Sequence, residues 1–171
     1  MSSVEQTLSI IKPDAVERNL ENEIKEMFKN NGFSILKEKK IQIEKSEAEK
    51  FYKVHETRPF YNDLCEYLSS GPIVVMILEK ANAVIDNRKL MGATDPKKAE
   101  EGTLRKKYGI SIDKNSVHGS DSVENANKEI NFFFKTLRAF SILLFLTSIV
   151  IAILVFKFYL RYILNPSSRY S

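Results

Sequence analysis

The chain has 171 residues, the length of one ordinary domain with an additional segment. Its 26 basic and 22 acidic side chains give a net charge of +4, but residues 135–171 hold five basic and no acidic ones, which leaves residues 1–134 at −1. A nearly neutral main part lacks the clustered positive charge of nucleic-acid binders, so no nucleic acid is expected as a primary ligand, and the single cysteine excludes a disulfide framework and a multi-cysteine zinc site.

The cysteine usage and the N-terminal sequence both favour a cytoplasmic protein. A lone cysteine, Cys65, is typical of a reducing compartment. Residues 1–6 are polar, and the apolar run Leu8–Ile11 is interrupted by Lys12 and Pro13, so a cleaved secretory signal is not expected.

The first predicted elements are a strand, a helix and a second strand. Residues 7–11 form a short apolar run stopped by Lys12-Pro13, which is typical of a strand that ends in a loop. Residues 20–28 then carry apolar side chains at helical spacing, and Asn30-Asn31-Gly32 can end that helix. Residues 33–43 alternate in parts and predict a half-buried strand.

The middle of the chain predicts three helices and a central strand. Ser46 with Glu49 has the pattern of a capping box, which would open a short helix through residues 51–52. Residues 61–68 show helical spacing of apolar side chains, and residues 73–78 are a continuous apolar run suited to a central strand. A further helix is expected near residues 83–90.

A long polar loop leads to a last helix from about Ser122. Asp121 and Glu124 could form its capping box, and one further strand could be hidden in the loop. The buried stripe expected for this helix is Ala126, Ile130, Phe133 and Phe134. The order of elements favours a ferredoxin-like α/β sandwich with an antiparallel sheet over a doubly wound parallel sheet, although spacing alone leaves both open.

The C-terminal segment carries the strongest signal of organisation. Residues 139–156 are 18 residues without a charge, glycine or proline. A helix of that length is about 27 Å long, close to the hydrocarbon thickness of a bilayer. The run predicts a transmembrane helix rather than a buried core helix, because so small a chain cannot cover it on every side. We therefore expect a domain at 1–134 and a separate tail at 135–171.

The residues that suit chemistry lie in two loops. No two of the six glycines are closer than seven positions, so neither a Rossmann nor a Walker phosphate loop can occur. His118 lies in a polar loop before a helix N-terminus, where an anion is favoured and a histidine can attack a phosphoryl group. The loop from Arg88 to Arg105 is suited to binding an oligophosphate. His55, by contrast, is more typical of a structural or surface residue.

Three motifs in chain order resemble the nucleoside diphosphate kinase family. Residues 115–122 carry the signature Asn-x-x-His-Gly-Ser-Asp-Ser, residues 11–16 match the N-terminal strand and loop, and residues 88–105 match the long nucleotide-binding loop. The resemblance covers about residues 4–134. It implies a ferredoxin-like sandwich with a four-stranded sheet and added helices. It also implies transfer of the γ-phosphate of ATP or another nucleoside triphosphate to nucleoside diphosphates by a ping-pong route.

The resemblance also implies roles for individual residues. His118 would be the nucleophile that becomes phosphohistidine, and Glu129 and Ser120 would orient its ring. The phosphates would be contacted by Lys12, Tyr52, Arg88, Thr94 and Arg105, the sugar by Asn115 and Lys12, and the base by Phe60. Mg²⁺ is implied as a companion of the bound phosphates, with no metal ligands assigned to the protein. A homo-oligomer, a tetramer or hexamer in relatives, is implied as well.

The tail is unlike the short soluble end of that family. Either the domain is tail-anchored in a membrane with the catalytic part in the cytosol, or the reading frame was altered near residue 135. Two other function classes stay open, a binding or regulatory module on the same fold and a membrane-anchored scaffold. The intact His118 motif and the net charge of −1 in residues 1–134 favour the enzyme.

Overall fold

The computed structural model describes residues 4–134, 154–157 and 159. The chain divides after Phe134 into two units, each described by itself. In the second unit, residues 154–157 are helical and their side chains are exposed. The apolar run predicted at 139–156 lies outside the described residues except for its last three positions. Within the described residues, no helix is both long enough and apolar enough to cross a bilayer.

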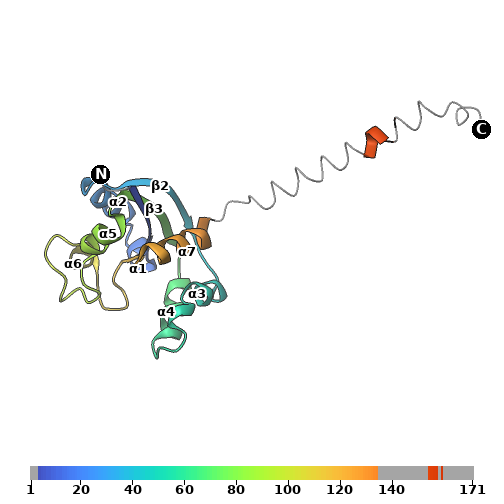
Figure 1. Cartoon of the computed structure of the whole chain (residues 1–171). Helices are drawn as coiled ribbons and strands as arrows, with labels where there is room; N and C mark the ends of the chain where they lie inside the picture. Colours follow the sequence, from blue (N-terminus) through green and yellow to red (C-terminus); the bar gives the residue numbers. More distant parts are fainter. Residues whose placement is uncertain (1–3, 135–153, 158, 160–171) are drawn as a thin grey trace, which may run out of the picture. The chain divides into compact units, whose positions relative to one another are not determined.

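Residues 4–134 form a four-stranded antiparallel sheet with helices packed against it, the ferredoxin-like α/β fold that was predicted (Figure 1). The strands lie in the order β2-β3-β1-β4, with bounds β1 Val4–Ile11, β2 Ser34–Ile41, β3 Ile73–Ala81 and β4 Val117–Gly119. β1 pairs with β3 along its whole length, from Val4 opposite Ala81 to Ile11 opposite Val74. The predicted central run at residues 73–78 is therefore an inner strand, and β4 is the strand hidden in the polar loop.

Residues 4–134 contain eight helices, one of which is a short 3-10 helix. Their bounds are α1 Pro13–Glu17, α2 Glu21–Asn30, α3 Lys45–Phe51, η1 Lys53–His55, α4 Tyr61–Ser69, α5 Ala83–Met91, α6 Leu104–Tyr108 and α7 Val123–Phe134. The five helices predicted at residues 20–28, from Ser46 through residues 51–52, at 61–68, at 83–90 and from Ser122 are confirmed. The short elements α1, η1 and α6 were not predicted.

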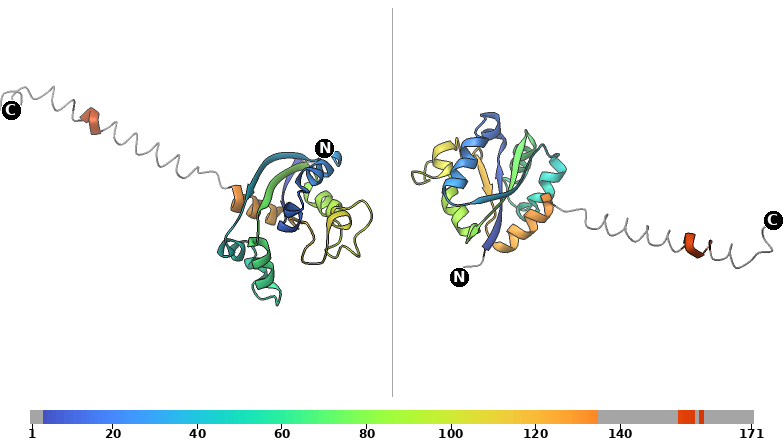
Figure 2. Two further views of the ribbon diagram at one scale, coloured as in Figure 1. Left: turned by 180° about the vertical axis from the view of Figure 1, so that it is seen from behind. Right: turned by 90° about the horizontal axis from the view of Figure 1, so that it is seen from above.

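Helices lie on both faces of the sheet (Figure 2), and both faces carry buried apolar residues. Alternate residues of β1 and β3 point to opposite faces. One face carries Ile11 and Met76 and packs against α1, α2, α5 and α6, whereas the other carries Leu8 and Val75 and packs against α3, α4 and α7. Burial on two faces explains why β3 begins with six consecutive buried apolar residues rather than an alternating pattern.

Both predicted capping boxes are wrong by one or two residues. The capping box of α3 is formed by Glu44 and Glu47, and the Glu47 carboxylate accepts the Glu44 N–H at 3.1 Å. At the start of α7, the Ser122 hydroxyl accepts the Asn125 N–H at 3.1 Å. A glutamate side chain can cap a helix N-terminus as a serine side chain does. The prediction started from Ser46 and therefore placed the first capping box two residues too late.

Candidate active site

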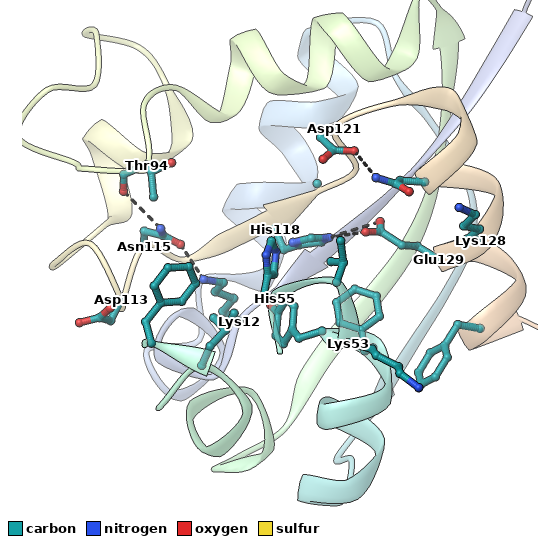
Figure 3. A pocket seen from close by; sticks show the side chains of 18 of the residues that line it. Lys12, Lys53, His55, Thr94, Asp113, Asn115, His118, Asp121, Lys128 and Glu129 are labelled. Carbon is teal, nitrogen blue, oxygen red and sulfur yellow. Dashed lines mark hydrogen bonds and ion pairs between the residues drawn. The ribbon is translucent and has the colours of Figure 1, made fainter. Parts of the chain in front are cut away.

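A pocket of about 800 Å³ lies beside β4 (Figure 3). Nine of the predicted site residues line it: Lys12, Tyr52, Phe60, Arg88, Thr94, Arg105, Asn115, His118 and Glu129. They come from loops and elements that are far apart in the sequence, including α5, α6, β4 and α7. The tenth, Ser120, hydrogen-bonds to Glu129. The fold therefore gathers the whole predicted set in one place.

His118 lies in the middle of β4, opposite Ile10 of β1, and its ring faces a carboxylate. Its Nε2 atom is 3.3 Å from each carboxylate oxygen of Glu129. The Ser120 hydroxyl donates to Glu129 Oε2 at 2.5 Å and accepts the Leu8 N–H at 3.3 Å, which anchors the carboxylate to β1. A carboxylate at Nε2 favours the proton on that nitrogen, so Nδ1 keeps the lone pair.

Aromatic rings enclose the imidazole on the α3 side. The centroids of Phe51 and Tyr52 lie 5.3 and 6.1 Å from that of His118, and both contacts are edge-to-face. The His118 side chain is only 20% exposed as a result. Burial, with a smaller effect of Glu129, raises the pKa of Tyr52 above its usual range, so its hydroxyl stays neutral and can donate a hydrogen bond.

Two cations lie close to each other in the pocket wall, Lys12 buried and Arg105 half-buried. Burial and the charge of Arg105 lower the pKa of Lys12 to about 8. Burial and the charge of Arg88 lower the pKa of Arg105 to about 10. Arg105 donates from its two terminal nitrogens to the carbonyls of Gly92 and Val117 at 3.0 and 3.1 Å, while its buried Nε has no partner among the described residues. Like charges held this close favour an anion as occupant.

Asn115 connects Lys12 with the long loop. Its Oδ1 accepts a hydrogen bond from Lys12 Nζ at 2.8 Å, and its Nδ2 donates to the carbonyls of Thr94 and Ile112 at 3.2 and 2.7 Å. These bonds hold the buried amide between Lys12 and the carbonyls of Thr94 and Ile112. Phe60 and Ile112 also line the pocket and are 50% and 55% exposed, so they offer two apolar surfaces to a flat ring.

Gly119 lets helix α5 approach the strand that carries His118. A Cβ atom on Gly119 would lie 2.4 Å from Asn87 Nδ2 and 2.9 Å from Met91 Sδ, both in α5. A side chain at this position would require the Asn87 and Met91 side chains to shift. The close contact brings Arg88, the next residue of α5, to the pocket that contains His118.

Sequence reasoning missed several residues of this pocket, among them Ile112 and His55. His55 was expected to be a structural or surface residue, but it lines the pocket, and its ring centroid is 6.1 Å from those of Tyr52 and Phe60. Its spacing of three positions after Tyr52 was the available signal, because residues three apart share a face in a helical turn. Ile112 lies in the polar loop and gave no signal.

The fold and the site define a class of protein, the phosphotransferases that act on nucleotides. A sequence profile described as nucleoside diphosphate kinase matches residues 5–138. The nucleoside diphosphate kinases of a Nitratiruptor species and of Campylobacter curvus are 60% and 56% identical over 131 residues, which is 77% of this chain and 96% of each relative. The crystal structure of the Aquifex aeolicus nucleoside diphosphate kinase is 39% identical, with a TM-score of 0.77, and the match covers 79% of this chain and 98% of that one. The chain belongs to the nucleoside diphosphate kinase family and is an enzyme of that kind.

Proposed function

We propose that the chain moves the γ-phosphate of a nucleoside triphosphate to a nucleoside diphosphate through a phosphohistidine at His118. The lone pair of His118 Nδ1 attacks the γ-phosphorus, and the bond to the bridging oxygen breaks, so that a nucleoside diphosphate leaves. A terminal phosphate oxygen of a second diphosphate then attacks the same phosphorus and restores the histidine. The observation that carries the proposal is the Nε2–Glu129 contact at 3.3 Å, since it leaves Nδ1 free beside a cationic pocket.

The other residues of the pocket act on charge and position. Lys12, Arg88 and Arg105 neutralise the phosphate oxygens, and Tyr52 and Thr94 donate hydrogen bonds from their hydroxyls. The Glu129 carboxylate, held by Ser120, stabilises the positive charge that the ring gains when Nδ1 forms a bond to phosphorus. These groups are positioned before the substrate arrives, so little reorganisation opposes the transfer.

The substrate range follows from the surfaces at the opening of the pocket. Phe60 and Ile112 would hold the base between apolar faces, and Asn115 with Lys12 would contact the sugar. Stacking needs only the face of a base, so purine and pyrimidine nucleotides, ribose and deoxyribose forms alike, are expected as substrates.

Mg²⁺ would enter with the nucleotide rather than bind to a site of its own. Among the described residues no group of three or more histidine, cysteine, aspartate and glutamate side chains lies close enough to hold a metal ion. The pocket carries Asp113 and Asp121 as separate carboxylates. Mg²⁺ is commonly bound by substrate phosphates with one or two carboxylates, which fits this composition. When bound, it would neutralise charge on the phosphate oxygens.

The test of this function is the phosphoenzyme itself. Incubation of the full chain with γ-labelled ATP and Mg²⁺, followed by denaturation, is expected to give protein-bound label that is acid-labile and alkali-stable. Addition of GDP, CDP or UDP is expected to discharge the label as the corresponding triphosphate. A chain that binds ADP but takes no label would contradict the enzyme and favour the binding-module alternative.

We also propose that the chain works as a homo-oligomer, a tetramer or hexamer, on the cytoplasmic side of the cell. The family membership supports the assembly, and β2 lies at the edge of the sheet with Leu36 45% exposed, which leaves a strand available for contact with another copy. The lone cysteine supports the reducing compartment.

The tail is proposed as a membrane anchor for the catalytic part. The full chain is expected to sediment with membranes and to be released by detergent but not by high salt. The variant Ile149→Arg places a charge in the middle of the apolar run, at a cost of about 2.5–3.5 kcal/mol for insertion, and should shift the chain to the supernatant. Ser167→Arg, beyond the run, is the matched control. If the wild-type chain and both variants showed the same distribution between membrane pellet and supernatant, an altered reading frame would be favoured over an anchor.

A further inference from the structure

Ser116, two residues before His118, has a strained backbone. Its φ is +68°, in the left-handed region, and the residue is completely buried. A residue with a Cβ atom adopts this conformation only when the surrounding structure holds it there. Because Asn115 precedes Ser116 directly, this turn decides where the Asn115 side chain points.

A buried hydrogen-bond network around Asp14 holds Ser116. The Ser116 hydroxyl lies 3.0 Å from Asp14 Oδ2 and 2.9 Å from the Tyr108 carbonyl, and it accepts a hydrogen bond from Arg18 at 3.1 Å. Arg18 also donates to Asp14 Oδ2 at 2.8 Å. The other carboxylate oxygen, Oδ1, accepts the hydroxyl of Tyr67 in α4. Burial and Asp14 raise the pKa of Tyr67, so that this hydroxyl keeps its proton.

The same turn also fixes Lys12. The Ser116 carbonyl accepts the Lys12 N–H at 2.9 Å, and Lys12 Nζ donates to Asn115 Oδ1 at 2.8 Å. Lys12 Nζ lies 5.5 Å from the centroid of the Tyr67 ring, whose hydroxyl is the partner of Asp14. Asp14 is thus connected to both members of the Lys12–Asn115 pair, although within the described residues it is not part of the pocket lining.

We propose that Asp14 is a positioning residue of the nucleotide site, which holds the left-handed turn at Ser116 and thereby fixes the Lys12–Asn115 pair for the nucleotide. The inference rests on the proposed function, in which this pair contacts phosphate and sugar. The ion pair of Asp14 with Arg18 is open to solvent on the arginine side, where such pairs add little to stability. Here the carboxylate accepts hydrogen bonds from Arg18 and from Tyr67 in α4, and it lies 3.0 Å from the Ser116 hydroxyl, so it connects α1 and α4 with the turn before His118.

The test compares Asp14→Asn with Glu17→Gln, a control that removes an exposed carboxylate from the same helix α1. The measurement is the Kd of ADP by calorimetry at pH 7. Asp14→Asn keeps the shape of the side chain, so the chain should fold. We expect ADP to bind about tenfold more weakly, and Glu17→Gln to change the Kd by less than about twofold.

The same substitution in an Asn115→Ala background separates positioning from a general loss of stability. If Asp14 acts through the pair, its removal there should weaken ADP binding by less than about twofold, because the hydrogen bond between Lys12 and Asn115 that it fixes is already absent. A tenfold loss in both backgrounds, or no loss in either, overturns the inference. Failure of the wild-type chain to bind ADP would instead refute the proposed function.

A second variant keeps the test decisive if Asp14→Asn does not fold. Tyr67→Phe removes the hydroxyl that donates to the Asp14 carboxylate and accepts the Asp14 N–H at 3.4 Å, and it leaves the ring beside Lys12. We expect about threefold weaker ADP binding in the wild-type background and none of this loss in the Asn115→Ala background. An unchanged Kd with Tyr67→Phe contradicts the positioning role.

Discussion

Replacement of His118 by alanine is expected to lower kcat for phosphate transfer from ATP to GDP by at least about 10⁴-fold, since no other group in the pocket can replace the nucleophile. The acid-labile phosphoenzyme should be absent from this variant. The pocket walls stay in place, because the side chain removed is small and 20% exposed, so ADP should bind with a Kd within about threefold of the wild type. Label incorporation, coupled-assay kcat and calorimetric Kd measure the three quantities.

His55 provides a matched control for this experiment. It is the other histidine of the chain and lines the same pocket, but its neighbours are the rings of Tyr52 and Phe60. The phosphoenzyme should therefore form in His55→Ala as in the wild type. Label that persists in His118→Ala and disappears in His55→Ala would move the nucleophile to His55.

Glu129→Gln separates the orientation of the ring from its nucleophilicity. The amide can still accept from Nε2, but it does not stabilise the positive charge of the phosphorylated ring. We expect the kcat of Glu129→Gln for phosphate transfer from ATP to GDP to lie between those of the wild type and His118→Ala, because the carboxylate acts through the histidine.

The large helices and the inner strands could be predicted because their signals are local. Apolar side chains at residues 20–28 and 61–68 recur every three or four positions, and the buried run at 73–78 needs no knowledge of its partners. The chemistry was predicted from the signature at residues 115–122, which keeps the nucleophile and its neighbours within eight positions. Such local patterns can be recognised in the sequence without knowledge of the fold.

The elements that could not be placed from the sequence depend on distant contacts. A strand in the polar loop was predicted without bounds, because β4 has only three residues and its strand character comes from pairing with β1, where Gly119 lies opposite Ser9. α6 has five residues, of which Arg105, Lys106 and Lys107 are basic, so it is too short to show an apolar period. The roles of Asp14 and Tyr67 were missed for the same reason, because their contact spans 53 positions.

The second large effect is expected at Lys12, whose charge depends on the occupant of the pocket. In the free chain, burial and Arg105 favour the neutral amine and lower the pKa to about 8, while Asp14 and Asp113 partly oppose this shift. The unfolded chain holds its proton up to the ordinary pKa of 10.5. Below about pH 8, the buried charge of Lys12 therefore lowers the free energy of unfolding by its full amount. This loss of stability disappears as the pH rises from 8 to 10.5.

Bound phosphates reverse this balance, since negative charge beside the ammonium raises its pKa again. Below pH 8, Lys12 is charged in both states and the affinity for ADP should change little. Above pH 8, binding must take up a proton, so the Kd of ADP should rise by up to about tenfold per pH unit until the pKa of the bound state is reached. Calorimetry between pH 7 and 9.5, in buffers of different ionisation enthalpy, measures both the Kd and the proton uptake.

Two substitutions of Lys12 make this prediction specific. Lys12→Met should lower kcat/KM for nucleotide by about 10²–10³-fold, the usual cost of one charged donor to a transferred phosphate, and should remove the dependence on alkaline pH. Lys12→Arg keeps a charge that does not titrate in this range, so it should remove the pH dependence while retaining more of the affinity than methionine does. If Lys12→Arg kept the alkaline rise in Kd, the titrating group would be one of the other charged residues near the phosphates and not Lys12. If it lost the rise, the buried amine would be established as the group that couples nucleotide binding to proton uptake.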